Sequence, residues 1–408
     1  MTETGRRDFL KTSLTASATV LLPSAASASP PNATDRAAPS VQSYRRLGRT
    51  ELEISDISMG TSRLREGQEN LVHHALDRGI NYFDSAESYT RGQSENVLGR
   101  ALKGERQNVY LVSKHIASAQ ESASSMMRVL EESLRRLNTD YIDVYMNHAI
   151  NSVARMENPE WAQFIAQAKA QGKIRFSGAS GHAGNLIECL DYVIDEDLAD
   201  VLLVAYNFGQ DPAFYEKITR SFDMIATQTD LPRVLAKAKE KDVGIVAMKT
   251  LMGARLNDMR PWEEGGATFS QAAFRWVLSN PQVDALVISM TGESQIDEFL
   301  GASGASALAH GDQALLERYA ALNGATYCRQ VCNECSDSCP YGVQIADVLR
   351  TRMYATDYED VQFARDEYAL LAVDGSACLS CSGEPCQNAC PHGIAIDQLC
   401  APTHRMLA

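Results

Sequence analysis

The sequence predicts an α/β protein, a parallel (β/α)8 TIM barrel followed by a small helical segment that is rich in cysteine. Short apolar runs alternate with amphipathic helical stretches between residues 57 and 289, at intervals of about 25–40 residues. Polar residues follow the ends of successive apolar runs, as they do at the mouth of such a barrel. Eight of the ten cysteines form two groups of four after residue 327.

Eight apolar runs are expected to be the strands, at residues 57–59, 80–83, 109–113, 142–146, 174–178, 201–206, 243–248 and 285–289. Between them, stretches such as Met126–Leu137 place apolar residues at helical spacing. Eight strand–helix repeats form a parallel sheet that closes without an edge. A doubly wound open sheet is the alternative, and it is disfavoured because no Gly-x-Gly-x-x-Gly follows the first strand.

The first 42 residues are expected to lie outside the fold. Arg6 and Arg7 precede the mildly apolar run Leu14–Leu22, which is too short to span a bilayer, and small residues follow at 24–29. Residues 1–29 resemble a twin-arginine (Tat) signal peptide, which implies export of the folded protein by the Tat machinery to the periplasm. Residues 30–42 are predicted to be a linker. A fortuitous basic N-terminus is the alternative.

The bulk composition is that of a globular protein, with 45% hydrophobic and 22% charged residues among 408. The formal net charge of −14 disfavours nucleic acid or an anionic membrane surface as a partner. We expect no stable insertion into a membrane. The charge is otherwise explained by solubility.

Four polar residues near consecutive strand ends indicate the chemistry: Asp84, Tyr89, Lys114 and His148. Reduction of a carbonyl needs a proton on oxygen, and a tyrosine with an ordinary pKa of about 10 is a weak acid at neutral pH. An ammonium beside the phenol is expected to lower the pKa of Tyr89, and a carboxylate holds that ammonium. Tyr89 is therefore the expected proton donor, Lys114 and Asp84 its support, and His148 the group that orients the carbonyl.

These residues lie in motifs that resemble the aldo-keto reductase superfamily over about residues 43–300. The motifs include Gly79-Ile-Asn-Tyr-Phe-Asp-Ser-Ala86 with Tyr89, Ser94-Glu95, Ser113-Lys114 and Gly172-Lys-Ile-Arg175. The resemblance implies a barrel domain over residues 43–310. It further implies NAD(P)H as hydride source, with the four residues above as the catalytic tetrad.

The resemblance also implies contacts to the nicotinamide cofactor. The residues at the corresponding positions are Ser180, Tyr206, Asn207, Lys249, Leu251, Gly253, Ser294 and Glu298. Tyr206 would stack on the nicotinamide ring, and Met248–Gly253 would lie over the pyrophosphate. After the eighth strand the usual basic residue is absent, and Glu293 and Asp297 are expected to repel a 2′-phosphate. A preference for NADPH is therefore in doubt.

The cysteines follow a repeated pattern in which the last cysteine of each group precedes proline, as in bacterial ferredoxins. It predicts two [4Fe–4S] clusters in a helical, ferredoxin-like domain at residues 311–408. One cluster, two zinc sites or disulfides are the alternatives. A branch of the aldo-keto reductases carries such a motif. The expected ligands are Cys328, Cys332, Cys335, Cys339, Cys378, Cys381, Cys386 and Cys390.

The remaining cysteines are Cys189, expected in the core, and Cys400, which is either a surface thiol or a spare ligand. The leading hypothesis is an exported oxidoreductase that interconverts a small carbonyl compound and its alcohol. A second hypothesis is an electron-transfer enzyme whose clusters serve a redox partner protein without free NAD(P)H. The third is a non-catalytic binding or assembly subunit.

Overall fold

The computed structural model describes residues 38–150, 152–182, 185–210, 230–251, 259–263, 267–323, 328, 334–356, 361–382, 385–391 and 393–408. Eight parallel strands form a closed barrel in the order β10-β3-β4-β5-β6-β7-β8-β9. Their bounds are β3 Ile57–Gly60, β4 Tyr82–Asp84, β5 Tyr110–His115, β6 Ile142–Asn147, β7 Ile174–Gly181, β8 Val201–Ala205, β9 Gly244–Met248 and β10 Ala285–Ser289. The predicted fold of this part is confirmed, and each predicted strand overlaps an observed one.

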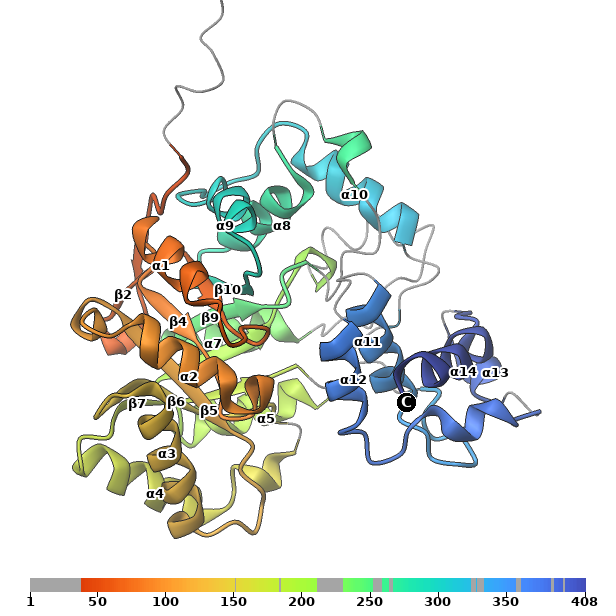
Figure 1. Ribbon diagram of the computed structural model, residues 1–408, viewed down its shortest axis with the longest axis horizontal. Helices are drawn as coiled ribbons and strands as arrows, with labels where there is room; N and C mark the ends of the chain where they lie inside the picture. Colours follow the sequence, from red (N-terminus) through yellow and green to blue (C-terminus); the bar gives the residue numbers. More distant parts are fainter. Residues whose placement is uncertain are drawn as a thin grey trace, which may run out of the picture. The chain divides into compact units, whose positions relative to one another are not determined.

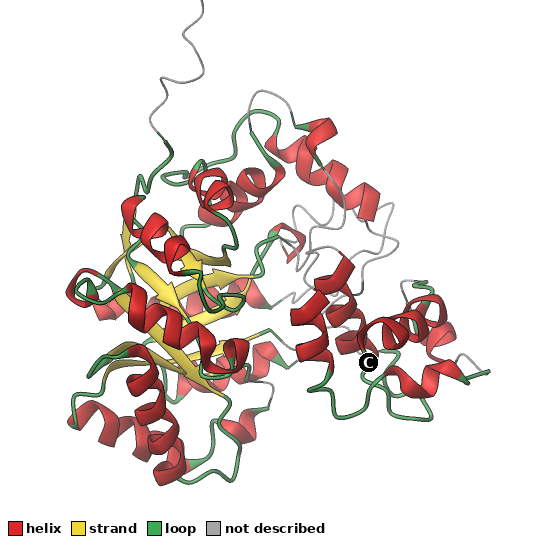
Figure 2. Cartoon of the chain, viewed as in Figure 1, coloured by secondary structure: helices red, strands yellow, loops and turns green. Residues whose placement is uncertain are grey.

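Helices cover the outside of the strands (Figure 2). They are α1 Glu69–Asp77, α2 Gln93–Ala101, α3 Ala123–Leu137, α4 Pro159–Ala170, α5 Leu186–Asp195, α7 Leu231–Glu240, α8 Phe269–Leu278 and α9 Glu293–Leu300. Local signals define their ends: Ser122 caps α3 by accepting from the Ser125 amide, and Asn138 ends it in the left-handed region. Helices α2 and α3 pack closely because Gly99 has no side chain; a β-carbon there would lie 2.4 Å from the Arg136 carbonyl oxygen.

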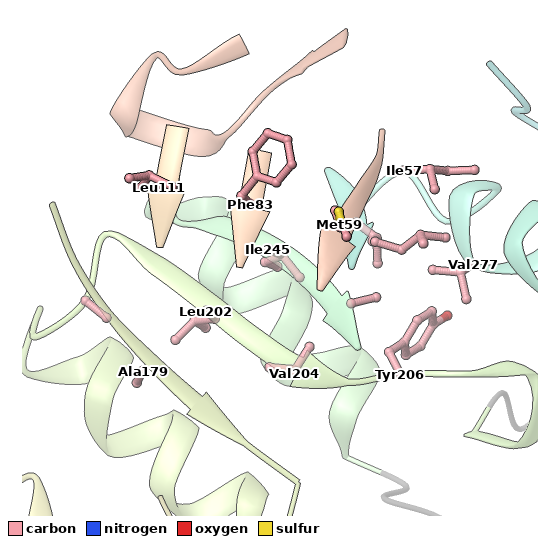
Figure 3. Packing of buried hydrophobic residues seen from close by; sticks show 14 of the residues in the cluster. Ile57, Met59, Phe83, Leu111, Ala179, Leu202, Val204, Tyr206, Ile245 and Val277 are labelled. Carbon is pink, nitrogen blue, oxygen red and sulfur yellow. The ribbon is translucent and has the colours of Figure 1, made fainter. Parts of the chain in front are cut away.

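Side chains of the strands alternate between two cores. Along β8, Leu202 and Val204 point outward into the core between strands and helices, while Val201 and Leu203 point into the barrel. Figure 3 shows outward residues from several strands, among them Ile57, Phe83 and Ile245, gathered in the outer core. The alternation fixes which residues at the strand ends face the barrel mouth.

A two-stranded antiparallel hairpin, β1 Tyr44–Arg46 and β2 Glu53–Ser55, precedes the barrel. Leu47, Leu52 and Ile54 from this hairpin are buried with the inward-facing side chains of the strands. The hairpin therefore closes one end of the barrel, and the sequence analysis did not predict it.

Helix α10, Asp312–Asn323, packs on the barrel although it lies beyond residue 310. Leu316 and Tyr319 belong to the outer core, and Arg275 of α8 binds the buried Asp312 carboxylate at 2.7 Å. The following elements are α11 Ile345–Thr356, α12 Val361–Tyr368, the 3-10 helix η7 Gly375–Leu379, α13 Pro385–Ala389 and α14 Ile396–Leu407.

These last elements lie together (Figure 1), and they bury a third, small core of their own. Val348, Ile396 and Leu407 are among its buried residues. Within the described ranges, no helix has the length and apolarity needed to cross a membrane.

Candidate active site

Strand alternation brings three members of the predicted tetrad to the barrel mouth. Asp84 is the last residue of β4, Lys114 lies one residue before the end of β5, and His148 follows β6. Each lies two residues beyond an inward-facing core residue, because side chains of one face recur with period two. Those core residues are Tyr82, Val112 and Met146. The sequence analysis ended the predicted strands at residues 83 and 113, one residue before Asp84 and Lys114. In the structure both residues lie within the strands.

Lys114 links the other members of the site. Its Nζ is fully buried, donates to Asp84 Oδ1 at 2.7 Å and lies 3.4 Å from the Tyr89 hydroxyl. Burial lowers the pKa of Lys114 and raises the pKa of Asp84, and the opposite charge of each partner counters the shift of the other. The second oxygen, Asp84 Oδ2, is buried and has no hydrogen-bond partner in the described part of the chain.

Tyr89 is positioned by a turn in left-handed backbone conformation. Thr90 and Arg91 have φ values of 47° and 57°, and the Thr90 hydroxyl donates to the Leu64 carbonyl at 2.8 Å. Burial raises the pKa of Tyr89 well above its usual value, and the negative charge of Asp84 adds to that rise. The expectation that Lys114 lowers this pKa is therefore wrong for the resting structure: desolvation of the phenolate dominates. Tyr89 holds its proton at neutral pH.

His148 lies beside the phenol. Its ring and that of Tyr89 meet edge to face with centroids 5.5 Å apart. Burial lowers the pKa of His148 well below 6.5, and the positive charge of Lys114 adds to the effect, so the ring is neutral. Nδ1 is buried without a hydrogen-bond partner among the described residues, which leaves one ring nitrogen of the site unsatisfied.

Arg155 holds the segment that carries His148, and the sequence analysis missed it. Its guanidinium donates to the carbonyl oxygens of His148 and Ala149, each at 2.7 Å, and to that of Ala117 at 2.8 Å. Burial lowers the pKa of Arg155, whose charge is stabilised by these carbonyl dipoles. No periodicity or motif marks such a residue, because its partners come from two separate loops.

The barrel part of the chain matches a known protein family. The family model described as "Aldo/keto reductase family" matches residues 56–261, half of the chain. The chain belongs to the aldo/keto reductase family. It is accordingly an oxidoreductase of that family.

Individual relatives of this reductase are distant. L-galactose dehydrogenase of Arabidopsis thaliana is 25% identical over 297 residues, which cover 63% of this chain and 87% of that protein. An aldo-keto reductase from Bacillus halodurans, solved in its holo form, superposes with a TM-score of 0.54 and 20% identity, covering 68% of this chain and 96% of that chain. An aldo-keto reductase from Klebsiella pneumoniae in complex with NADPH gives a TM-score of 0.52 at 23% identity, covering 68% and 95%.

Several residues at the predicted cofactor positions of the reductase lie at the ends of β7, β8 and β9. The Ser180 hydroxyl accepts from the Ala149 amide at 3.0 Å, and Asn207 Nδ2 donates to the Lys249 carbonyl at 3.2 Å. Lys249 itself has a φ of 57°. Leu251 is buried, and Gly253 lies outside the described residues. Their roles toward a dinucleotide stay predictions.

Tyr206 lies on the outer side of the barrel wall. Its ring packs against Trp276 with centroids 5.1 Å apart, and its hydroxyl accepts from Asn280 at 2.8 Å. Figure 3 shows it in the outer core near Val277. Its stacking on a nicotinamide stays a prediction, and the ring is 6% exposed.

The acidic residues of α9 have partners on α1 and directly after it. Asp297 accepts from Arg78 at 2.7 Å and pairs with His74 at 2.9 Å, and these contacts lower its pKa. Glu293 accepts from Asn70 at 2.8 Å. The negative charge that the sequence analysis set against a 2′-phosphate is thus partly neutralised. Ser294 is exposed on the same helix, and Glu298 Oε1 is buried without a partner in the described structure.

The cysteines of the C-terminal segment gather around the third core. Cys335 and Cys400 are buried in it. The described thiols packed against it come from both groups, Cys328, Cys339, Cys378, Cys386 and Cys390. Every cysteine that the structure describes is free, so it shows no disulfide there. No described group of three or more residues has an arrangement ready for a metal ion.

The two cysteine groups meet. Cys339 of the first group and Cys378 of the second are both close enough to Cys386 to influence its ionisation. Cys400 shares a hydrogen bond with Cys378 and is fully buried, so it is not a surface thiol. Cys381 is partly exposed, and Cys332 lies outside the described residues. Cys189 is buried in the barrel core as predicted.

The C-terminal helices reach the loop that carries Tyr89. Asp366 of α12 accepts from Arg91 at 2.8 Å. Tyr354 of α11 and Glu367 of α12 lie close enough to Tyr89 to add to the rise of its pKa. Residues from beyond the barrel therefore take part in the environment of Tyr89.

Proposed function

We propose that this reductase interconverts a small carbonyl compound and its alcohol, with Tyr89 as proton donor and a nicotinamide as hydride source. The observation that supports the proposal most directly is the Asp84–Lys114–Tyr89 chain beside the neutral His148. A buried phenol that keeps its proton at neutral pH suits the role of a general acid.

Tyr89, Lys114 and Asp84 act together on the carbonyl oxygen of the substrate. The Tyr89 hydroxyl donates its proton there, and the ammonium of Lys114 stabilises the phenolate that remains. Asp84 keeps Lys114 charged and in place. His148, being neutral, donates one N–H to the same oxygen and orients it. When bound, a nicotinamide supplies the hydride to the carbonyl carbon.

The residues present fit a nicotinamide cofactor. Two buried polar atoms without partners in the described structure, His148 Nδ1 and Glu298 Oε1, lie at positions where the family binds substrate and dinucleotide. The NADPH-bound relative from Klebsiella pneumoniae supports this assignment through its fold. Ser180 and Asn207 would hold the nicotinamide side, Lys249 the pyrophosphate, and Ser294 and Glu298 the adenosine side.

Titration of the purified protein with NADPH and with NADH, followed by cofactor fluorescence, tests the proposal. We expect one of them to bind with a Kd below about 10 μM, equivalent to roughly 7 kcal/mol. Consumption of that dinucleotide should then depend on an added aldehyde or ketone. Absence of binding by both dinucleotides would contradict hydride transfer from a nicotinamide.

We further propose that the C-terminal cysteines hold iron–sulfur clusters. Supporting observations are the free thiols of both groups around one small core and the proximity of Cys386 to Cys339 and Cys378. Thiolates bind iron and zinc alike, so the metal must be measured. Anaerobic purification should give about eight iron and eight sulfide per chain, as two cubane clusters require. Zinc without sulfide would contradict the proposal.

The export proposal concerns residues 1–37, which lie outside the described part. Its support is the paired arginines ahead of a short apolar run. Fusion of residues 1–42 to a reporter that is exported only when folded should place the reporter in the periplasm. Replacement of Arg6 and Arg7 by lysine should retain it inside the cell, and unchanged export would contradict a twin-arginine route.

Cluster-linked electron transfer is a second candidate function, favoured by the Arg91–Asp366 contact between the Tyr89 loop and α12. In that case clusters would exchange electrons with a substrate at the barrel mouth and with a redox partner protein. Addition of the alcohol, which gives up two electrons and two protons as it becomes the carbonyl compound, should then reduce the clusters and bleach their absorbance without any dinucleotide. An unchanged spectrum would assign the clusters a structural role.

A further inference from the structure

Three buried hydroxyl groups form a chain of hydrogen bonds beside the Asp84–Lys114 pair. The hydroxyl oxygens of Ser85 and Ser94 lie 2.8 Å apart, and the Ser94 hydroxyl donates to that of Thr61 at 2.7 Å. Thr61 in turn donates to the carbonyl oxygen of Asp84 at 2.8 Å. All three hydroxyl-bearing residues are at most 1% exposed, so the chain is closed to solvent.

The direction of the chain follows from the number of its protons. A hydroxyl has one hydrogen to donate. That of Ser94 goes to Thr61, and that of Thr61 goes to the Asp84 carbonyl. The Ser85 hydroxyl is therefore the donor in its contact with Ser94. Hydrogen bonds that run in one direction polarise one another in a dry interior, so loss of the middle hydroxyl affects both neighbours.

The chain surrounds the peptide group between Asp84 and Ser85. The N–H of this peptide donates to the Val112 carbonyl of β5 at 2.9 Å. Its carbonyl oxygen accepts from both the amide and the hydroxyl of Thr61, which follows β3, at 2.9 Å and 2.8 Å. Neighbouring strands on both sides of β4 thus hold the peptide, and the serine hydroxyls complete its support.

The residues joined by this peptide supply two acceptors for Lys114. The Lys114 Nζ donates to Asp84 Oδ1 at 2.7 Å and to the Ser85 carbonyl oxygen at 2.5 Å. An ammonium has three N–H groups, so one is left for the Tyr89 hydroxyl at 3.4 Å. The orientation of the peptide therefore sets the direction in which Lys114 faces Tyr89.

Ser94 also holds the far end of the loop that carries Tyr89. It is the second residue of α2, and its amide donates to the Thr90 hydroxyl at 2.9 Å. Its side chain meets Ser85 at the beginning of the same loop. The contact between the two serine hydroxyls thus links the two ends of residues 85–94.

We propose that Ser94 is a positioning residue whose hydroxyl keeps Lys114 aimed at the Tyr89 hydroxyl. It acts through the two neighbouring hydroxyls and the peptide that they support. The inference rests on the proposed role of Tyr89 as proton donor. As the phenol gives up its proton, negative charge develops on its oxygen, and a well-aimed ammonium stabilises that charge. Ser94 should therefore affect the chemical step and not the binding of substrate.

Replacement of Ser94 by alanine breaks the chain at its middle and keeps the backbone contact to Thr90. We expect the single-turnover rate of NADPH or NADH oxidation by 4-nitrobenzaldehyde to fall about 10–100-fold in S94A. The KM for the aldehyde and the Kd for the dinucleotide should stay within about twofold. S58A is the matched control, because it breaks another buried contact between serine hydroxyls, Ser55 with Ser58 at 2.9 Å. It should leave the rate unchanged.

A second comparison separates positioning from a general loss of structure. In the Y89F background S94A should cause no further loss of rate, because no phenolate is left for Lys114 to stabilise. S85A removes the first donor of the chain and should show the same dependence on Tyr89. Equal losses with and without the Tyr89 hydroxyl, or wild-type rates in both serine variants, would overturn the inference while the reductase activity stands.

Absence of 4-nitrobenzaldehyde reduction by the wild type would count against the carbonyl chemistry, and unfolding by urea then decides the inference. The midpoint shift caused by S94A should be smaller in the Y89F background than in the wild type, since coupled residues give non-additive effects. Equal shifts would overturn the positioning role. The same curves show that each variant is folded, and S85A replaces S94A in every comparison if S94A is not.

Discussion

Lys114 meets Asp84 at 2.7 Å between neighbouring strands of the barrel, whereas the thiols of the C-terminal segment line a small core and none is bonded to another sulfur among the described cysteines. Strand alternation and barrel closure fix the first site before any ligand binds. In the second, free thiols remain around a core made of short helices. The barrel site is preorganised by its backbone, whereas no bond fixes the described thiols relative to one another.

Loss of the Tyr89 hydroxyl should have the largest effect on the barrel site. Y89F is expected to lower kcat by about 10²–10⁴-fold, because it removes the hydroxyl proposed to give the proton. Steady-state kinetics with an aldehyde that the wild type reduces measures the loss. Y145F is the matched control, since the Tyr145 hydroxyl is buried without a described partner on the outer side of β6. A similar loss in both variants would argue against Tyr89 as donor.

Removal of Lys114 tests how much the buried Lys114–Asp84 ion pair stabilises the barrel. K114M leaves the buried Asp84 carboxylate without its counter-ion and should lower the free energy of unfolding by about 3–5 kcal/mol. Addition of D84N should recover most of this stability without recovering activity. Urea unfolding of the single and double variants gives the interaction free energy between Lys114 and Asp84. A loss below about 1 kcal/mol in K114M would show that water reaches the pair.

The buried histidines should make the barrel sensitive to acid. The pKa values of His148 and His182 lie well below 6.5, so the unfolded chain binds protons that the folded chain does not as pH falls below about 6.5. The free energy of unfolding should therefore fall by up to about 1.4 kcal/mol per pH unit for each histidine.

His115 provides the contrast for that measurement. Glu87 and Glu121 raise the pKa of His115 against the opposing effect of burial. The stability that this protonated histidine adds to the folded state is therefore present at low pH and is lost as pH rises through its folded pKa. Urea unfolding between pH 5 and 8 should show a shallower acid slope in H148N and a steeper one in H115N. Parallel curves for both variants and the wild type would contradict these assignments.

The smallest effect is expected at the contact between the two regions. Arg91 and Asp366 form a solvent-accessible ion pair, with the Arg91 side chain 76% exposed, and such pairs contribute about 0–1 kcal/mol. D366N should change the unfolding temperature by a few degrees at most, as calorimetry would show. A destabilisation of the barrel transition by more than about 2 kcal/mol would mean that the C-terminal helices are required for the barrel site.

The sequence by itself determined the barrel and three of the four tetrad positions at its mouth. Apolar runs of strand length recur with helical stretches between them, and the ends of parallel strands necessarily meet at one rim. Asp84, Lys114 and His148 follow from that local pattern. The helical character of Ile345–Thr356 and the buried position of Cys189 were also local properties.

Only the tertiary structure decided how these residues behave. The pKa of Tyr89 rises because of burial and the charge of Asp84, and Asp297 is neutralised by Arg78, which follows another helix. The hairpin that closes the barrel was missed because its short strands are stabilised by the barrel they cover. These features depend on burial, packing and charges between residues that are distant in sequence. The local pattern of apolar residues carries no information about such contacts.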